Sequence, residues 1–158
     1  MTYEFDKTCC FTGHRIIPNN ERQFIYEKTL EICQSLIKRG FENFITGGAL
    51  GFDTLAAGCV LSLKETHKNI KLIMALPCVD QCKGWKSSDT RKYEKILSLA
   101  DEINYVSKGY SPDCMKKRNR FMVDKSCVCV SYIKRMSGGT AYTVSYAVES
   151  GREIIFVR

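Results

Sequence analysis

Short apolar runs alternate along the whole chain with longer segments in which apolar residues recur every three or four positions. The runs have the length of buried strands, and the periodic segments have the spacing of amphipathic helices. Glycine or proline follows several segments and marks their ends. Strands are predicted over residues 8–13, 43–46, 71–76, 102–106, 127–133 and 153–157, and helices over 20–39, from 53 onward, 88–100, 113–124 and 141–150.

This order of elements predicts the fold class. Most of the predicted strands are apolar on both faces, which is typical of a parallel sheet covered by helices on both sides. We therefore expect an α/β, doubly wound fold with a mainly parallel sheet. At 158 residues, and with no repeat, low-complexity segment or linker, the chain is expected to form a single domain over residues 1–158.

Three predicted strands end in glycine-containing turns, with the sequences FTGHR, ITGGALGFD and SYIKRMSGGTAYT. The carboxyl ends of parallel strands share one edge of the sheet, and doubly wound folds bind ligands at that edge. A Gly-Gly pair before a helix lets backbone amides approach an anion, which the helix dipole also attracts. Neither pair has the P-loop or dinucleotide spacing, so tight turns without a ligand are the alternative.

Polar residues that could contact a ligand lie beside these turns. Asp53 is expected either to cap its helix or to contact a ribose hydroxyl, because a carboxylate would repel a phosphate. Thr140 and Thr143 could donate hydrogen bonds to a phosphate, and Thr140 is equally expected as a helix cap. Arg15, at the end of the first strand, is placed to bind a phosphate.

The helix before the fifth strand is rich in basic and amide side chains, with Arg118, Asn119 and Arg120 in succession. Arg120 and Asp124 are one helical turn apart and are expected to form a surface ion pair. A solvated helix face is the default interpretation of this segment, and Asn119 fits that interpretation least well.

Nine cysteines and a formal charge of +7 bear on the location of the protein, its metal sites and its partners. The count is odd and the N-terminal residues lack a signal-peptide pattern, so we expect free thiols and a cytoplasmic location. The apolar runs are too short to cross a membrane, and no membrane partner is expected. Cys127 and Cys129 alternate along a strand and should share one face, which suits a tetrahedral metal poorly, and we expect no metal site. The positive charge favours anionic partners.

Five segments in order carry a family resemblance: CCFTGHR, GGALGFDTLAA, LPCVDQCKGW, RNRFMVDKS and SGGTAYTVSYA. With them the chain resembles the YpsA-like family of the SLOG superfamily, which includes the cytokinin-activating LOG enzymes and the DNA-processing protein DprA. The match extends from about residue 8 to residue 157. It implies a Rossmann-like fold that binds a nucleotide or nucleotide-derived ligand at the glycine-rich edge of the sheet.

The resemblance also implies which residues form the ligand site. Carried over position by position, they are Gly13, His14, Arg15, Gly47, Gly48, Ala49, Asp53, Pro77, Gln81, Trp85, Arg118, Asn119, Gly138, Gly139, Thr140 and Thr143. Asp124 belongs to the fourth segment. Cys78 stands where the family usually has an aromatic residue, and Cys127 stands where it usually has aspartate, which affects details of the ligand and not the fold.

Hydrolysis of a nucleoside monophosphate is one implied function. LOG enzymes use the glutamate of a P-G-G-x-G-T-x-x-E motif, but residues 144–146 of this chain, in the corresponding region, are Val, Ser and Tyr. Glu149 is nine residues past Thr140, about 13 Å along the helix axis, which is too far to replace that glutamate. The catalytic candidates that are left are Asp53, Asp124 and His14. We therefore favour ligand binding by a sensor or regulator over hydrolysis.

Single-stranded nucleic-acid binding, by analogy with DprA and from the positive charge, is the weaker alternative. Its candidate stacking aromatics are Tyr93, Tyr110 and Phe121, although helical spacing favours Phe121 as a core residue. AMP, NAD, ADP-ribose and cyclic nucleotides fit the glycine edge about equally, no cofactor is singled out, and a homo-oligomer is compatible with the sequence. This hypothesis predicts that Gly48→Val or Arg15→Ala abolishes ligand binding and leaves the fold largely intact.

Overall fold

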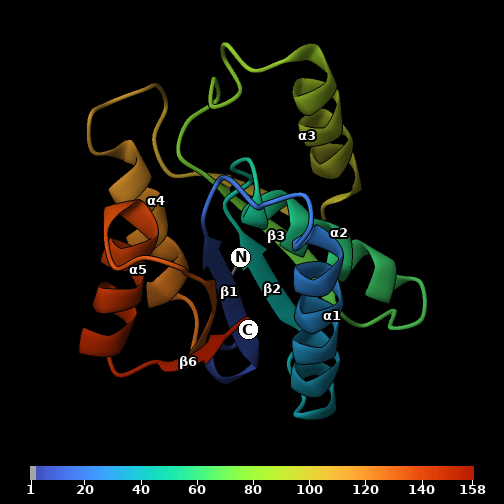
Figure 1. Ribbon diagram of the computed structural model, residues 1–158. Coiled ribbons are helices and arrows are strands. Elements are labelled where there is room, and N and C mark those ends of the chain that lie inside the picture. The colour runs from blue at the N-terminus through green and yellow to red at the C-terminus, as the bar shows by residue number, and fades with distance from the viewer. Residues whose placement is uncertain (1–2) are drawn as a thin grey trace.

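A computed structural model describes residues 3–158 and arranges them as a six-stranded parallel sheet with helices on both faces (Figure 1). The strands are β1 (Thr8–Gly13), β2 (Asn43–Thr46), β3 (Lys71–Leu76), β4 (Glu102–Tyr105), β5 (Val128–Tyr132) and β6 (Glu153–Phe156). The helices are α1 (Arg22–Lys38), α2 (Phe52–Lys64), α3 (Ser87–Leu99), α4 (Cys114–Asp124) and α5 (Gly138–Glu149), with a 3₁₀ turn at Phe5–Lys7. The predicted doubly wound, Rossmann-like α/β fold is confirmed.

Each face of the sheet packs against its own group of helices. α1, α2 and α3 cover one face, and α4 and α5 cover the other, on opposite sides of the sheet in Figure 1. Cys9 and Phe11 of β1 belong to the larger core under α1–α3, and Cys10 belongs to the smaller core under α4 and α5. The central strands are mostly apolar because both of their faces are buried. Within residues 3–158, no helix is both long and apolar enough to span a membrane.

The prediction that Cys127 and Cys129 share a face is wrong. Cys129 lies in β5 and belongs to the smaller core, whereas Cys127 packs against the larger core on the other side of the sheet. The reason is that β5 begins at Val128, so Cys127 precedes the strand and does not follow its alternation.

Two predicted helix caps are also wrong. The N-cap of α2 is Gly51, and Asp53 lies inside the first turn. The N-cap of α5 is Ser137, and Thr140 is the third residue of the helix. This helix begins at Gly138, three residues earlier than predicted, because the Gly-Gly pair forms its first turn and not a loop before it.

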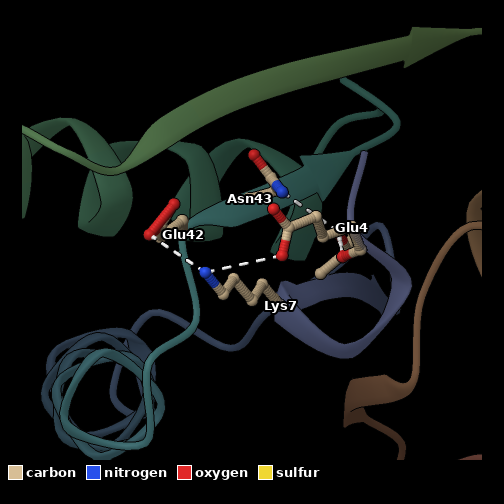
Figure 2. A network of polar contacts seen from close by, with 5 residues as sticks. Glu4, Lys7, Glu42 and Asn43 are labelled. Carbon is tan, nitrogen blue, oxygen red and sulfur yellow. Dashed lines mark hydrogen bonds and ion pairs between the residues drawn. The ribbon is translucent and has the colours of Figure 1, made fainter. Parts of the chain in front are cut away.

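Polar contacts close the amino-terminal edge of the sheet (Figure 2). Lys7 Nζ lies 3.4 Å from Glu4 Oε2 and 3.9 Å from Glu42 Oε2. Asn43 donates a hydrogen bond to Thr8 Oγ1 (3.2 Å) where these residues pair in the register of β1 and β2, and Thr8 donates to the Glu4 carbonyl oxygen (2.7 Å). Exposed ion pairs of this kind add little stability. Internal contacts thus occupy this edge, and a ligand site is expected at the opposite one.

The strand order β4-β3-β2-β1-β5-β6 places a topological switch point in the middle of the sheet. From β1 the chain adds β2, β3 and β4 outward on one side, and it then crosses over to place β5 against the other side of β1. The order therefore reverses between β1 and β5. In open α/β sheets, ligands bind beyond the carboxyl ends of the strands at such a point.

Two glycines allow the loops at this edge to pack closely. A Cβ on Gly13 would lie 2.5 Å from the Phe52 side chain, and a Cβ on Gly51 would lie 2.2 Å from the Arg15 carbonyl oxygen. Gly51 also has a φ of +82°, which glycine adopts without strain. The Phe52 amide donates to the His14 carbonyl oxygen at 3.0 Å, so the start of α2 lies directly against the end of β1.

We expect Gly51→Ala to lower the free energy of unfolding by at least about 2 kcal/mol, because it combines a positive φ with a backbone clash. Gly58→Ala, within α2, is the matched control. In the described part of the chain, no atom beyond the adjoining helix backbone lies within 4 Å of the Cβ position of Gly58. The better helix propensity of alanine should therefore raise the free energy of unfolding by about 0.5–1 kcal/mol. Urea denaturation measures both values, and equal effects would contradict the close approach of Gly51 to the loop after β1.

Candidate functional site

A cleft of about 630 Å³ opens at the carboxyl ends of β1 and β5, at the switch point. Its volume is typical of small-molecule sites. The loops after β1 and β5, the start of α2, the start of α5 and α4 all contribute to it. The lining residues are Thr12, Gly13, His14, Arg15, Ile16, Pro18, Glu21, Ala49, Asp53, Met115, Arg118, Asn119, Met122, Tyr132, Lys134, Arg135, Ser137, Gly138, Gly139 and Thr140.

The N-terminus of α5 forms one wall of this cleft. Its N-cap, Ser137, makes no side-chain hydrogen bond to the first turn. The first amides of a helix have no partner inside it, and the helix dipole places partial positive charge beside them. Gly138 has a φ of +87°, and among residues 3–158 no atom outside the adjoining backbone lies within 4 Å of a Cβ added to it or to Gly139. An anion can therefore reach these amides without meeting a side chain.

Positive side chains outnumber negative ones in the cleft. The bases are Arg15, Arg118, Lys134 and Arg135, and the acids are Glu21 and Asp53. Lys134 Nζ lies 2.8 Å from Glu21 Oε1, and this ion pair neutralises one charge of each sign. The remaining balance is positive, which favours an anionic group in the cleft.

The guanidinium of Arg118 fills the space that glycine leaves at position 47. Nη1 donates to the carbonyl oxygens of Gly47 (2.6 Å) and Ala75 (3.4 Å), and Nε donates to Asn119 Oδ1 (2.8 Å). A Cβ on Gly47 would lie 2.4 Å from Nη1. Among the described residues, the acceptor of Nη2 is the Met115 sulfur, at 3.6 Å, which is a weak acceptor. The first glycine of the Gly-Gly turn thus accommodates a buried guanidinium, and Nη2 keeps donor capacity for a ligand.

Asp53 is the buried acid of the cleft, with 6% of its surface exposed. Its Oδ2 accepts a hydrogen bond from the Ala49 amide at 3.2 Å, which holds the loop between β2 and α2. Burial raises the pKa of the Asp53 carboxyl, whereas the Arg118 guanidinium, the Ala49 amide and the Arg15 guanidinium lower it. The two cations therefore offset part of the free-energy cost of burying this charge.

His14 connects the two sides of the switch point. It follows β1, is buried, and its Nε2 accepts a hydrogen bond from the Lys134 amide, in the loop after β5, at 2.8 Å. An accepting Nε2 requires a neutral ring with its proton on Nδ1. Burial lowers the pKa of His14, and the positive charge of Arg135 lowers it further. Because the lone pair of Nε2 is used in this structural bond, His14 has no free basic nitrogen for proton transfer.

The structure brings ten of the predicted ligand residues together in this cleft. They are Gly13, His14, Arg15, Ala49, Asp53, Arg118, Asn119, Gly138, Gly139 and Thr140. Six predicted ligand residues are not among the lining residues. They are Gly47, Gly48, Pro77, Gln81, Trp85 and Thr143.

Residues of the third sequence segment support the cleft from behind. Gln81 donates to the Gly47 carbonyl oxygen (3.2 Å) and to the Tyr93 hydroxyl (3.3 Å). Trp85 contacts Tyr93 edge to face, with ring centroids 5.2 Å apart. Pro77 is buried at the end of β3. This layer fixes the position of the Gly47 backbone and, through it, of the guanidinium that lines the cleft.

Gly48 and Thr143 are buried as well. Gly48 has a φ of +73°, and its Cβ would lie 3.1 Å from each of three core side chains. Gly48→Val would therefore disturb the core, and the expectation that it leaves the fold intact is wrong. Thr143 donates to the Gly139 carbonyl oxygen at 3.0 Å, a bond within α5.

Asp124 lies at the opposite edge of the sheet from the other catalytic candidates. It is the last residue of α4, and the chain then enters β5 at its amino end, where the Cys127 amide donates to the Thr8 carbonyl oxygen. Asp124 Oδ1 accepts a hydrogen bond from the Tyr146 hydroxyl at 2.7 Å. The predicted pair with Arg120 is not among the ion pairs of residues 3–158. Asp124 therefore cannot act on a ligand held in the cleft.

Sequence reasoning placed the loop after β5 at the ligand edge but missed three of its side chains. Lys134, Arg135 and Ser137 line the cleft, and Glu21 reaches it from the segment before α1 to pair with Lys134. A signal was present, because KRM stands between a strand and a Gly-Gly pair, where basic side chains reach the ligand edge.

The three candidate stacking aromatics do not form one surface. Tyr93 is buried in the larger core, Phe121 packs against the smaller core, and Tyr110 is 73% exposed. Single-stranded nucleic acids stack successive bases on several exposed rings. The described residues also contain no group of three or more His, Cys, Asp or Glu side chains that could hold a metal ion.

Comparison with known proteins places these features in a family. The sequence model described as the YspA SLOG family matches residues 17–153. The SPbeta prophage-derived protein YoqJ of Bacillus subtilis strain 168 is 37% identical over 134 residues, which cover 77% of this chain and 78% of YoqJ.

Two solved structures of DprA are similar in fold. DprA from Streptococcus pneumoniae superposes with a TM-score of 0.67 at 15% identity, over 96% of this chain and 50% of that chain. DprA from Helicobacter pylori gives a TM-score of 0.67 at 17% identity, over 94% of this chain and 64% of that chain. The chain thus spans about half to two thirds of the length of these DprA chains, and the likeness at these identities is one of fold alone.

His14 should make the stability of the protein depend on pH. Its pKa is lower in the folded protein than the usual value of about 6.5, so the unfolded chain binds the extra proton between the two values. The stability of the fold that depends on a neutral His14 is fully present above a pH of about 6.5, and it is lost as the pH falls through the folded-state pKa. His14→Gln keeps a hydrogen-bond acceptor and cannot be protonated. As the pH falls below about 6.5, we therefore expect the Tm of His14→Gln to fall less than the Tm of the wild type.

His14→Ala is the control for this prediction. It also removes the titration, but it loses the bond to the Lys134 amide and should have a lower Tm than His14→Gln already at pH 8. Thermal unfolding followed by circular dichroism between pH 5 and 8 gives all three curves. Parallel curves for the wild type and His14→Gln would contradict the proposed protonation of His14.

Proposed function

The chain belongs to the YspA SLOG family, and on that premise we propose that its cleft binds a nucleotide or nucleotide-derived ligand as a sensor or regulatory module. The observation that carries the proposal is the uncapped N-terminus of α5 at the topological switch point. A phosphate there would accept hydrogen bonds from free amides and interact favourably with the helix dipole.

The side chains around this helix support an anionic ligand. Arg135 is exposed and lines the cleft two residues before the N-cap of α5. Arg118 Nη2 has only a thioether acceptor among the described residues, so it can bind a second oxygen of the same ligand. Guanidinium groups match the geometry of phosphate oxygens, and two of them on one cleft suit a phosphorylated ligand.

The acids of the cleft favour binding without turnover. Hydrolysis of an N-glycosidic bond needs a carboxylate that stabilises positive charge and activates water. Glu21 is paired with Lys134, and the negative charge of Asp53 is partly balanced by the guanidinium groups of Arg118 and Arg15. The region that carries the glutamate in LOG enzymes has no acid here.

Nucleic-acid binding is the competing function. The Helicobacter pylori DprA, which shares the fold, binds single-stranded DNA, and the net charge of +7 suits a polyanion. The scattered aromatic side chains argue against this function. It would be recognised by an affinity for single-stranded DNA that falls steeply as the salt concentration rises.

We expect Arg135→Ala to weaken nucleotide binding about tenfold, because it removes one charge-assisted contact to the phosphate. AMP, ADP-ribose and NAD are first screened by thermal shift, and the compound with the largest shift is titrated by calorimetry. Mass spectrometry of each incubation detects a released base or ribose phosphate.

Arg91→Ala is the matched control, because it removes the same charge from the exposed surface of α3. It should leave the affinity unchanged. Equal weakening by both variants would assign the effect to net charge and contradict the site. No shift with any compound, together with salt-sensitive binding of single-stranded DNA, would replace the proposal with the competing function. A released base would contradict binding without turnover.

A further inference from the structure

The cleft offers many hydrogen-bond donors to a ligand and one buried charged acceptor. Its donors include the first amides of α5, the exposed Arg135 and Nη2 of the buried Arg118. Of its two acids, Glu21 is neutralised by an ion pair at 2.8 Å. Asp53 has no ion-pair partner within 4 Å among residues 3–158, and it is 94% buried.

The hydrogen bonding of Asp53 is incomplete. A carboxylate can accept about four hydrogen bonds. The described residues supply Asp53 with one, from the Ala49 amide at 3.2 Å to Oδ2. A buried charge with unused acceptor capacity is costly, and this one lines a cleft that a ligand can enter. A ligand that donates a hydrogen bond to Asp53 would therefore recover the lost solvation.

The surroundings of Asp53 determine which donor fits. Arg118 and Arg15 line the same cleft as Asp53, and both guanidinium groups favour its charged form. An anionic group beside Asp53 would be repelled by it, although the neighbouring guanidinium groups attract anions. The ligand should then carry a phosphate for the bases and a neutral hydroxyl donor for Asp53, within a short distance of each other.

We propose that Asp53 accepts a hydrogen bond from a ribose hydroxyl, so that the cleft takes ribonucleotides in preference to deoxyribonucleotides. This inference rests on the proposed function, since it identifies the sugar of the same ligand. A ribose hydroxyl is one sugar ring away from the 5′-phosphate, whereas an amino group of the base lies beyond the glycosidic bond. Asp53, Arg15 and Arg118 line one cleft, so a hydroxyl donor close to the phosphate suits them better than a donor on the far side of the base.

The preference is measured by calorimetric titration of the wild-type protein with AMP, GMP, CMP and UMP and with the 2′-deoxy and 3′-deoxy form of each. For every ribonucleotide that binds, at least one deoxy form is expected to bind at least about tenfold more weakly, because a site built to bond a hydroxyl rejects the analogue without it. IMP, which lacks the amino group of AMP, should bind like AMP.

Asp53→Asn tests whether this carboxylate causes the preference. The amide keeps the shape and an acceptor for the Ala49 amide but loses the charge, so the ratio between the ribo and deoxy forms should fall to within about threefold. Thermal unfolding checks that the variant is folded. The comparison of ribo and deoxy forms on the wild-type protein tests the inference even if the variant does not fold. Arg91→Ala is again the control, with the wild-type ratio expected.

The outcomes separate this inference from the proposed function. Equal binding of ribo and both deoxy forms by the wild type would overturn the inference and leave nucleotide binding in place. A strong preference for AMP over IMP with no sugar preference would assign Asp53 to the base and also overturn it. If folded Asp53→Asn keeps the wild-type sugar preference, Asp53 is not the cause of that preference and the inference is overturned. If no nucleotide binds, the proposed function fails and this inference fails with it.

Discussion

The position of the Arg118 guanidinium, against the bare backbone of Gly47, fixes the geometry of the whole site. From α4 it donates hydrogen bonds to the loop after β2 and to Ala75 in β3. A buried guanidinium is costly unless its donors are used, and carbonyl oxygens together with the charge of Asp53 meet most of that requirement. As a result, α4, the start of α2 and the sheet edge hold fixed positions around the cleft before any ligand arrives.

The glycines of this edge serve three different purposes that look alike in the sequence. Gly47 makes room for a guanidinium, Gly13 and Gly51 allow α2 to lie against the loop after β1, and Gly138 leaves the first amides of α5 open. The difference lies in what occupies the place of the missing Cβ, which is a protein group in the first three positions and open space in the last. Only the last arrangement leaves room for an anion.

The fold was predictable because the signal for buried parallel strands is local. β1, β2 and β3 have the predicted bounds, since both of their faces are buried and mostly apolar. The shared edge of parallel strands predicted where the site lies, and the family resemblance supplied the ten predicted residues that line the cleft. The wrong predictions concern residues whose place in the fold the local sequence pattern does not determine. Trp85 packs behind the Gly47 loop, and Asp124 ends at the far edge because a crossover helix runs antiparallel to the strands. Lys134 was missed because loop residues follow no period.

The charged side chains of the cleft form an exposed outer layer and a buried inner layer, and the two layers affect a ligand differently. Arg15 and Arg135 are exposed, so solvent and salt screen their charges, and for the proposed anionic ligand they would add long-range attraction to any direct contact. Arg118 and Asp53 are buried, where screening is weak and hydrogen-bond geometry decides whether a group is accepted. In the proposed binding mode, the outer bases attract the ligand and the inner pair orients it. For this reason an outer substitution should change affinity for all anions alike, whereas a change at the inner pair should alter which ligand is preferred.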